Sequence, residues 1–378
     1  MKNNEFVQIE RYEGVQPLIN AQLELALSKD ELIKLDGNEN PRDIDPEIKE
    51  KILRECQFNL YPDPNATELT KLLSKKYNID EEMILVGAGI DELLDLCFRG
   101  LLTNESQLLS IIPTFGMYKF LANVNNITIK EIPSKLIVKD YYAEFQINEQ
   151  EILEQAKNSK AVVLARPNNP DGGFLSRVFI ETLLQEDLYV IIDEAYIEYA
   201  NEPGLIDLLD YYENLIILRT FSKAYGLGGL RIGFGFMSKS IKNRLSRIKL
   251  PYNVNTVAEK SACELLTSGI IEKNLNEDKL LREVFSAQLI QLQTMCPFFW
   301  QFRSQGNFIL LYFQTIDRTD LFYSFLRQKG VLTRKYSNSI LRYFVRISLG
   351  TKEDMNKVLA LIKEFIEEYY SYGPSSIH

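Results

Sequence analysis

The sequence predicts an α/β protein with a large domain, built on a mainly parallel sheet flanked by helices, and a smaller α+β domain. Short apolar runs rich in β-branched residues recur between residues 84 and 237 and lack polar–apolar alternation. Such runs are typical of strands buried on both faces of a parallel sheet. The intervals between them leave room for crossover helices. Beyond about residue 258 the pattern changes to a long helical stretch, followed by mixed strands and helices.

We expect the strands of the large domain in the apolar runs at residues 84–86, 108–112, 161–165, 189–192, 215–218 and 232–237. A glycine turn follows the first run and opens a helical stretch over residues 90–102. A chain of 378 residues is long enough to form two lobes.

The second part of the chain predicts the smaller domain. Residues 256–295 have helical spacing and few breakers, so we expect a long helix that could bridge two lobes. Strand-like pieces follow at residues 307–313 and 344–348, and helices at residues 320–329 and 352–370. We therefore predict a large domain over residues 36–262. The small domain, with an N-terminal arm, would comprise residues 1–35 and 263–378.

The charged and titratable residues exclude several classes of function. Histidine occurs once, as His378, which argues against a Ser-His-Asp triad, a Cys-His pair, an HExxH zinc site and a histidine general base. Acid–base chemistry near neutral pH would need another proton carrier, and a lysine with a shifted pKa is the obvious candidate. The 43 basic and 52 acidic residues give a net charge of −9, which argues against nucleic-acid binding.

Cysteine content and hydropathy predict a cytoplasmic protein without a metal site. The four cysteines form no CxxC pair, and sparse unpaired cysteine fits a reducing compartment. The first residues, MKNNEFVQIERYEG, contain no apolar stretch typical of a secretory signal. The apolar runs are far shorter than the ~20 residues that a membrane helix needs, so we expect no membrane span.

The motif RTFSKAYGLGGLRIGFGF at residues 219–236 is the strongest chemical signal. It sets Lys223 among aromatic residues and glycines rather than charges. A lysine in an apolar setting loses proton affinity and becomes a usable nucleophile. Thr220, Ser222 and Arg231 add two hydroxyls and a guanidinium, which suit a phosphate monoester. A snorkelling surface lysine is the alternative, and the arginine with the intervening glycines makes it the weaker interpretation.

A carboxylate follows an apolar strand in YVIIDEAYIEY, at residues 189–199. Asp193 would lie at the carboxyl end of a parallel strand, where ligands bind. A buried, ionised Asp needs a cationic partner, and a protonated pyridine nitrogen would serve and would act as an electron sink. Metal binding or a helix N-cap is the alternative, and the metal interpretation is weak because only Glu194 lies nearby.

Three further motifs are weak signals when taken alone. RPNNPDGG carries Asn169 on a turn, from which its amide could reach an aromatic hydroxyl of a ligand. GAGIDE, at residues 87–92, opens a helix whose backbone amides could bind a phosphate. PTFGMY places Phe115 after a strand, where its ring could stack on a flat cofactor or simply belong to the core.

In this order the motifs resemble those of pyridoxal-phosphate (PLP) enzymes of the aspartate-aminotransferase fold, the fold type I transferases. More narrowly, the chain resembles the histidinol-phosphate aminotransferases over about residues 33–362. The motifs that carry the resemblance are KLDGNENP (34–41), YPDP (61–64), DEAY (193–196), RTFSKA (219–224), PYNVN (251–255), GVLTR (330–334) and RISLGT (346–351).

The resemblance implies a PLP cofactor and a set of site residues. Lys223 would form the Schiff base, Asp193 would pair with the pyridine nitrogen, Asn169 and Tyr196 would hold the 3-oxygen, and Phe115 would stack on the ring. The substrate would meet Arg346, which binds its anionic group, and Arg334, which reads the phosphate of the preferred substrate. The residues implied for the cofactor phosphate are Ala88, Gly89, Ile90, Asp91, Thr220, Ser222, Arg231 and, from the other subunit of a homodimer, Tyr61.

The implied reaction is amino transfer between the small molecules L-histidinol phosphate and 2-oxoglutarate, in histidine biosynthesis. The alternatives are an aminotransferase for aromatic or other amino acids, a decarboxylase of the threonine-phosphate type and a cofactor-binding regulatory module. The chain departs from the family pattern at Ile90, where serine is usual, and at Asp171, where a small hydroxyl is common and a charge would reach the site mouth. Residues 335–343 lack the usual glycine-rich stretch. These departures bear on substrate choice.

Overall fold

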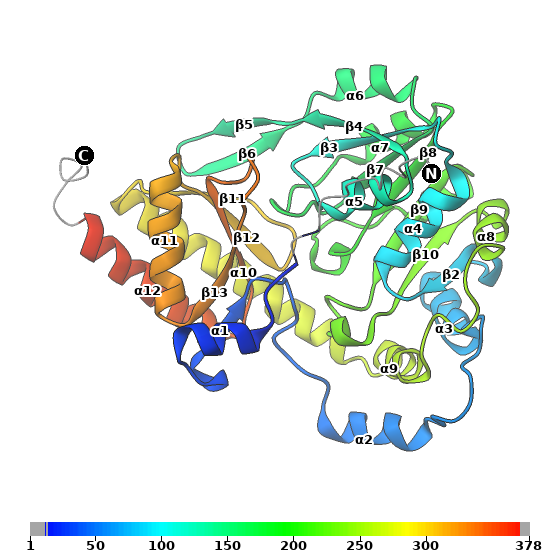
Figure 1. Cartoon of the computed structure of the whole chain (residues 1–378), viewed down its shortest axis with the longest axis horizontal. Coiled ribbons are helices and arrows are strands. Elements are labelled where there is room, and N and C mark those ends of the chain that lie inside the picture. Colours follow the sequence, from blue (N-terminus) through cyan, green and yellow to red (C-terminus); the bar gives the residue numbers. More distant parts are fainter. Residues whose placement is uncertain (1–11, 13, 371–378) are drawn as a thin grey trace, which may run out of the picture.

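The computed structural model describes residue 12 and residues 14–370, and it contains two sheets that lie side by side with helices around each (Figure 1). The predicted N-terminal arm is described only at residue 12 and from residue 14 onward. The tail YGPSSIH and His378 lie outside the described residues.

The first sheet lies at the centre of the large domain. Five of its strands, β9, β8, β7, β3 and β4, run parallel to one another. Strand β10 is antiparallel to both of its neighbours, β2 and β9. The prediction of a mainly parallel sheet is therefore confirmed. In spatial order the strands are β2 (Ile84–Gly87), β10 (Gly233–Met237), β9 (Leu215–Thr220), β8 (Tyr189–Asp193), β7 (Ala161–Ala165), β3 (Gln107–Ile112) and β4 (Thr128–Pro133).

Amphipathic helices cover this sheet. Helix α4 packs against β2, β9 and β10, and Leu93, Cys97 and Leu101 repeat every four residues on its buried face. The strands beneath are buried along nearly their whole length, as expected for a sheet covered on both faces. The helices of this half are α2 (Pro46–Glu55), α3 (Thr67–Tyr77), α4 (Ile90–Leu101), α5 (Met117–Val124), α6 (Glu149–Ala156), α7 (Arg177–Leu184), α8 (Lys239–Ser246) and α9 (Thr256–Thr267).

The second sheet is mixed and packs against the C-terminal helices. Its strands, in spatial order, are β1 (Ile33–Leu35), β13 (Val331–Lys335), β14 (Phe344–Ser348), β12 (Phe308–Tyr312), β11 (Trp300–Phe302), β6 (Tyr142–Gln146) and β5 (Lys135–Val138). Its helices are α1 (Leu18–Leu25), α10 (Ile270–Met295), α11 (Ile316–Gln328) and α12 (Lys352–Tyr370). The β5–β6 hairpin joins this sheet although residues 135–146 fall inside the predicted large domain. The boundaries 36 and 262 otherwise stay predictions.

The long helix expected over residues 256–295 is in fact two helices. Gly269 separates α9 from α10 and has a φ of +69°, a left-handed conformation that glycine adopts readily. Helix α9 packs on α2 and α3 in the large domain, whereas α10 packs on β11 and α12 in the small domain. The predicted bridge between lobes is therefore made by this helix pair.

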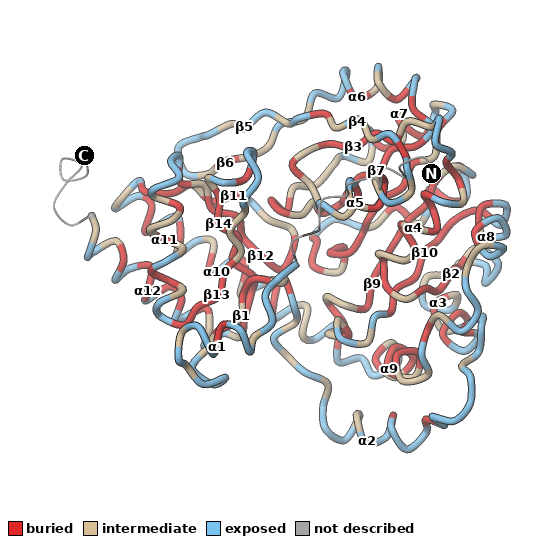
Figure 2. Tube along the Cα trace, viewed as in Figure 1, coloured by how far each residue is buried: buried red, intermediate tan, exposed pale blue. Residues whose placement is uncertain are grey.

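Buried residues concentrate in the two sheets and in the helix faces turned toward them (Figure 2). The largest apolar cluster surrounds the first sheet, and a second one lies between the second sheet and helices α10, α11 and α12. No helix in the described part of the chain is both long and apolar enough to cross a membrane.

Candidate active site

A cavity of about 480 Å³ opens where the first sheet meets the second. The carboxyl ends of β3, β7, β8 and β9 reach it, which is the edge of a parallel sheet where ligands bind. Most of the predicted site residues line this single cavity: Ile90, Asp91, Phe115, Asn169, Asp193, Tyr196, Thr220, Ser222, Lys223, Arg231, Arg334 and Arg346. The predicted residues that do not line it are Ala88, Gly89 and Tyr61.

Lys223 lies three residues beyond the end of β9 and turns its amine into the cavity. Its Nζ donates a hydrogen bond to the carbonyl oxygen of Gly37, at 3.1 Å. Burial, and then the nearby charge of Arg346, lower the pKa of Lys223 to about 8. A substantial fraction of the amine is therefore neutral, and nucleophilic, near physiological pH.

Asp193 is the last residue of β8, and only 4% of it is exposed. Burial raises the pKa of its carboxyl to about 6, while hydrogen bonds from Tyr118 and from the Ala195 amide act in the opposite direction. The Tyr118 hydroxyl donates to Oδ2 at 2.7 Å, and the Ala195 N–H donates to Oδ1 at 2.9 Å. These two donors leave the carboxylate fixed at the floor of the cavity.

A group of hydrogen-bond donors suited to an anion lies where helix α4 begins, at Ile90. The preceding residue, Gly89, has a φ of +86°, and a Cβ built there would lie 2.9 Å from Nη2 of Arg231. Arg231 donates to Asp91 Oδ2 at 2.9 Å and approaches Ser222 Oγ at 3.5 Å. A helix N-terminus without a side-chain cap, flanked by hydroxyls and a guanidinium, is suited to a phosphate group.

Two of the predicted phosphate-binding amides are already bonded within the chain. The N–H of Ala88 donates to the Glu92 carboxylate at 2.6 Å, and the N–H of Gly89 donates to the Gly87 carbonyl at 2.9 Å. Asn253, from the PYNVN motif, donates to the same Glu92 oxygen at 2.6 Å. The amides that the helix can offer to an anion therefore begin at Ile90.

The segment KLDGNENP ties the N-terminal region to both domains. Asn38 donates to the Tyr196 hydroxyl at 3.1 Å, and Asn169 approaches that hydroxyl at 3.5 Å. The Asn38 N–H donates to the Ser348 hydroxyl at 2.9 Å, so β14 holds the same turn. The family resemblance includes this motif but implies no role for Asn38, because the contacts of Asn38 are with residues far away in sequence.

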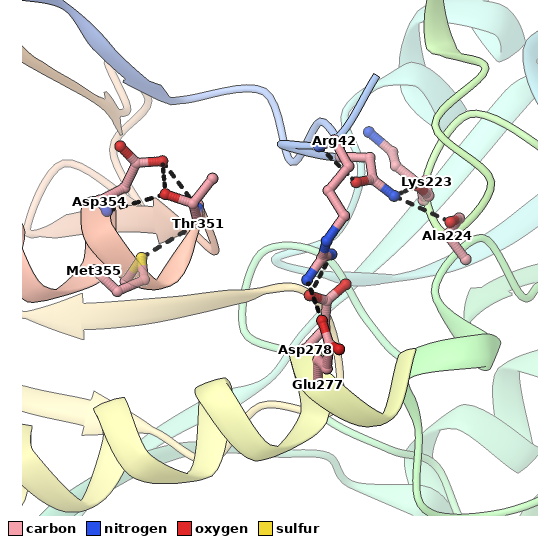
Figure 3. A network of polar contacts seen from close by, with 10 residues as sticks. Arg42, Lys223, Ala224, Glu277, Asp278, Thr351, Asp354 and Met355 are labelled. Carbon is pink, nitrogen blue, oxygen red and sulfur yellow. Dashed lines mark hydrogen bonds and ion pairs between the residues drawn. The ribbon is translucent and has the colours of Figure 1, made fainter. Parts of the chain in front are cut away.

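Asn40, in this segment, contacts the loop that carries Lys223. Arg42, just after the segment, contacts helix α10. The Asn40 amide donates to the carbonyl oxygens of Lys223 and Ala224, at 3.2 and 3.0 Å. Arg42 reaches α10 and pairs with Asp278 at 2.7 Å (Figure 3). The N-terminal segment thus holds the backbone of the loop that carries Lys223.

Arg334 and Arg346 are directly opposite each other on the antiparallel strands β13 and β14. Arg346 donates to Asn169 Oδ1 at 2.6 Å and to the Asp36 carbonyl at 2.8 Å, while Arg334 donates to the Gly14 carbonyl at 3.1 Å. Like charges directly opposite on a sheet destabilise it. Their pairing in a cavity wall therefore points to an anionic ligand between or above them.

The structure corrects one expectation and adds aromatic residues. Asp171 does not place a charge at the site mouth, because it is buried outside the cavity lining and accepts a hydrogen bond from Asn168 at 2.5 Å. Tyr12 lines the cavity and meets Phe115 and Phe120 edge to face, with ring centroids 6.1 and 6.3 Å apart. Tyr118 and Tyr336 line it as well. Of these three tyrosines, only Tyr118 belongs to a motif that the sequence analysis considered for cofactor binding, PTFGMY.

In the part of the chain that the structure describes, no group of three or more His, Cys, Asp and Glu side chains could hold a metal ion.

Comparison with known proteins shows the family to which the chain belongs. A family model for aminotransferase class I and II matches residues 30–362. The chain is 34% identical over 360 residues to chloroplastic histidinol-phosphate aminotransferase 1 of Arabidopsis thaliana, covering 95% of this chain and 84% of that protein. It is 32% identical over 357 residues to histidinol-phosphate aminotransferase of Pyrococcus furiosus, covering 93% and 98%.

A solved structure shows the same fold. The crystal structure of the histidinol-phosphate aminotransferase from Clostridium acetobutylicum superposes with a TM-score of 0.79 at 23% identity, covering 89% of this chain and all of that one. This likeness confirms the predicted fold. Because the family model spans most of the chain and the relatives exceed 30% identity, the chain belongs to the class I and II aminotransferases and, among them, to the PLP-dependent histidinol-phosphate aminotransferases.

Proposed function

We propose that this enzyme transfers the amino group of L-histidinol phosphate to 2-oxoglutarate in histidine biosynthesis. The observation that carries the proposal is the pair Arg334 and Arg346, opposite each other in the same cavity as Lys223. Both substrates of this reaction carry an anionic group away from the reacting carbon. Two guanidinium groups supply the charge-assisted hydrogen bonds that a phosphate ester and a carboxylate can each accept in turn.

The residues of the cavity fit PLP as cofactor. The cradle at Gly89, which a Cβ would fill, would receive the phosphate with Ile90 and Asp91 amides, Arg231 and the hydroxyls of Thr220 and Ser222. Asp193 would hold the proton on the pyridine nitrogen, and Phe115 would pack on the ring. Asn169 and Tyr196 would hydrogen-bond to the 3-oxygen. When bound, PLP supplies an electron sink for the carbanion left by loss of the Cα proton.

Lys223 would move the proton in an enzyme that has no histidine in the described residues. Its Nζ lies in the cavity and would take the proton from the substrate Cα and hold it for return to the bound reactants. A pKa of about 8 suits both halves of this transfer, since the amine gains and loses a proton readily near neutral pH. Gly37, whose carbonyl accepts from Nζ, holds the amine within the cavity meanwhile.

We also propose a homodimer in which Tyr61 reaches the phosphate of the neighbouring site. Tyr61 is 82% exposed and does not line the cavity of its own chain. Its ring stacks on Tyr252 at a centroid distance of 4.7 Å, next to the exposed apolar side chains of Phe58, Leu60 and Leu250. Exposed apolar side chains gathered in this way are typical of a surface that another protein covers. Because Tyr61 does not reach the cavity of its own chain, we infer that a second copy of the chain covers them.

A cytoplasmic location is part of the proposal. All four cysteines, Cys56, Cys97, Cys263 and Cys296, are free rather than paired. Free cysteines are typical of proteins in reducing compartments. Fractionation of the cells that make the protein would test it, and recovery with a secreted or membrane fraction would overturn it.

Half-reactions test the substrate directly. The PLP form would be mixed with L-histidinol phosphate, L-phenylalanine or L-glutamate, and the loss of the cofactor's visible absorbance followed in time. The proposal expects the highest kcat/KM for L-histidinol phosphate, with L-glutamate reacting as the reverse of the second half-reaction. A preference for L-phenylalanine would replace the proposal with an aromatic aminotransferase, and release of carbon dioxide from a phosphorylated amino acid would replace it with a decarboxylase.

A further inference from the structure

A tyrosine in the wall of the cavity has an unmet hydrogen bond. Tyr336 follows the end of β13 and lines the cavity. Its hydroxyl oxygen is shielded from solvent and has no hydrogen-bond partner within the described residues, 12 and 14–370. Buried hydroxyls without a partner are rare in folded proteins, because such a group loses the hydrogen bonds that water offered it. A ligand in the cavity is therefore the natural source of the missing partner.

The surroundings of Tyr336 select an anion as that ligand. The guanidinium carbon of Arg334 lies 5.6 Å from the centroid of the Tyr336 ring, and Arg346 is the cross-strand neighbour of Arg334. Nε of Arg346 is a second buried donor without a partner among the described residues, since only its two Nη atoms are bonded. Burial raises the pKa of the Tyr336 hydroxyl, so it keeps its proton and acts as a donor.

Other groups that act on Tyr336 agree with this choice. The charges of the two arginines also act on the Tyr336 hydroxyl, in the direction that lowers its pKa. The carboxylate that acts on it, Asp171, lies outside the cavity lining and already accepts from Asn168. Arg334 and Arg346, which line the cavity together with Tyr336, thus supply hydrogen-bond donors and positive charge.

We propose that Tyr336 is a specificity-determining residue whose hydroxyl donates to the phosphate ester of the amino donor, beside Arg334. The inference rests on the proposed function and deepens it. A phosphate monoester has three strong acceptor oxygens, so it can accept from Tyr336, Arg334 and Arg346 together. A carboxylate in the same place has fewer acceptors for three donors, and an unphosphorylated amino alcohol brings no anion at all.

The test is the variant Tyr336→Phe, assayed with L-histidinol phosphate and with L-histidinol, which differ only in the phosphate. The kcat/KM for L-histidinol phosphate should fall about ten- to a hundredfold, because a hydrogen bond to a charged group is lost. The kcat/KM for L-histidinol should change by less than about twofold, since that substrate never used the hydroxyl. The melting temperature of the enzyme without substrate should stay the same or rise, because the variant loses an unpaired buried hydroxyl.

Tyr343→Phe is the matched control from the same connection. The hydroxyl of Tyr343 accepts a hydrogen bond from Arg342 and does not line the cavity, so both kcat/KM values should stay at the wild-type level. Equal losses with the two substrates, or a lower melting temperature without any change in substrate preference, would overturn the inference and leave the proposed function intact. A wild-type enzyme that does not transaminate L-histidinol phosphate would instead overturn both.

Discussion

Single residues set the chemistry through two buried groups whose pKa values converge toward neutrality. Burial lowers the pKa of Lys223 to about 8 and raises that of Asp193 to about 6, because in each case the charged form is the one that burial disfavours. Perturbed pairs of this kind mark acid–base sites. We propose that Lys223 has the proton-carrying role that histidine has in many other enzymes, and that Asp193 is the charge partner of the cofactor.

Replacement of the lysine should abolish turnover. We expect Lys223→Ala to lose at least about a thousandfold in kcat, because general acid–base and covalent catalysis both depend on this amine. Borohydride should fix PLP to the wild type at Lys223, identified by peptide mass, and should fix none to the variant. Lys119→Ala is the control and should keep its activity. Lys119 also lines the cavity, but its amine is exposed and forms an ion pair with Glu131. Near-normal transamination by Lys223→Ala would contradict the assignment.

The rate at which the cofactor-free protein captures PLP should depend on pH through Lys223. The pKa is lowered from 10.5 to about 8, so the fraction of neutral amine rises about tenfold per pH unit below pH 8 and then levels off. Stopped-flow absorbance between pH 6 and pH 10 would measure the rate constant. A rate that keeps rising beyond pH 10 would mean that the pKa of the lysine is not lowered by its surroundings.

The hydroxyl of Tyr118 should hold Asp193 ionised. Its hydrogen bond lowers the pKa of the carboxyl, so Tyr118→Phe should raise that pKa above its wild-type value of about 6. Asp193 would then gain a proton as the pH falls from 8 to 6, and the dissociation constant for PLP should rise more steeply than in the wild type. Equilibrium dialysis at several pH values measures this. Asp193→Asn, which cannot ionise, should bind PLP weakly and should lack the part of the pH dependence that comes from Asp193.

Among the elements, one loop of the large domain depends on a glycine where it touches the small domain. Gly172 has a φ of +75°, and a Cβ built on it would lie 2.6 Å from the Cα of Ser304. The Gly172 carbonyl accepts from the Gln305 N–H at 3.0 Å, and the Gln305 side chain accepts from the Asn201 N–H at 2.8 Å. The connection before β12 is therefore held against the loop that carries Asn169.

Gly172→Ala should consequently be strongly destabilising. We expect a loss of about 2–4 kcal/mol in the free energy of unfolding, from the strained φ and from overlap with the Ser304 backbone. Thermal denaturation of the holoenzyme measures the effect as a lower melting temperature. Gly229→Ala is the control, because no atom lies within 4 Å of a Cβ built there and its φ is not in the left-handed region. Equal melting temperatures for the two variants would contradict the argument.

The strands that the sequence predicted correctly are buried along most of their length, and they include β2 at the edge of the first sheet. Residues 161–165 and 215–218 consist of uninterrupted apolar residues and form the middle of the first sheet. Strands β4, β5 and β6 alternate or carry charges because they are only partly buried, and β1 and β11 have three residues each. Short and half-exposed strands give a weak periodic signal, since pairing across the sheet rather than composition stabilises them.

The site divides in a similar way. Lys223 and Asp193 can be predicted as site residues because each stands in a motif of its own, whose residue types and place at a strand end indicate their chemistry. Asn38, Tyr118 and Tyr336 cannot, because their roles depend on partners that are near only in the folded chain. Ala88 and Gly89 show the opposite case. Their motif predicts amides that bind a phosphate, but both amides donate to groups of the chain itself, Glu92 and Gly87.

At the scale of the whole molecule, the exposed surface around Tyr61 is the one that the proposed dimer would cover. A chain of 43.7 kDa that forms the proposed dimer should sediment with twice that mass. The ring of Tyr61 and its partner Tyr252 should be buried in the assembly, because an exposed apolar group of this size is costly on a free surface. A fully active monomer in analytical ultracentrifugation would contradict the dimer and the role of Tyr61 together.

Hybrid dimers test whether Tyr61 acts in its own site or in its neighbour's. Tyr61→Phe alone should weaken PLP binding about ten- to a hundredfold, through loss of a hydrogen bond to the phosphate. If Tyr61 acts across the interface, a hybrid of Lys223→Ala and Tyr61→Phe contains one site in which both residues are wild type. Mixing and refolding the two variants at limiting PLP should then give more activity than either variant alone. If Tyr61 served its own chain, the hybrid would contain no intact site and the mixture would only average its parents, because each defect would remain in the subunit that carries it.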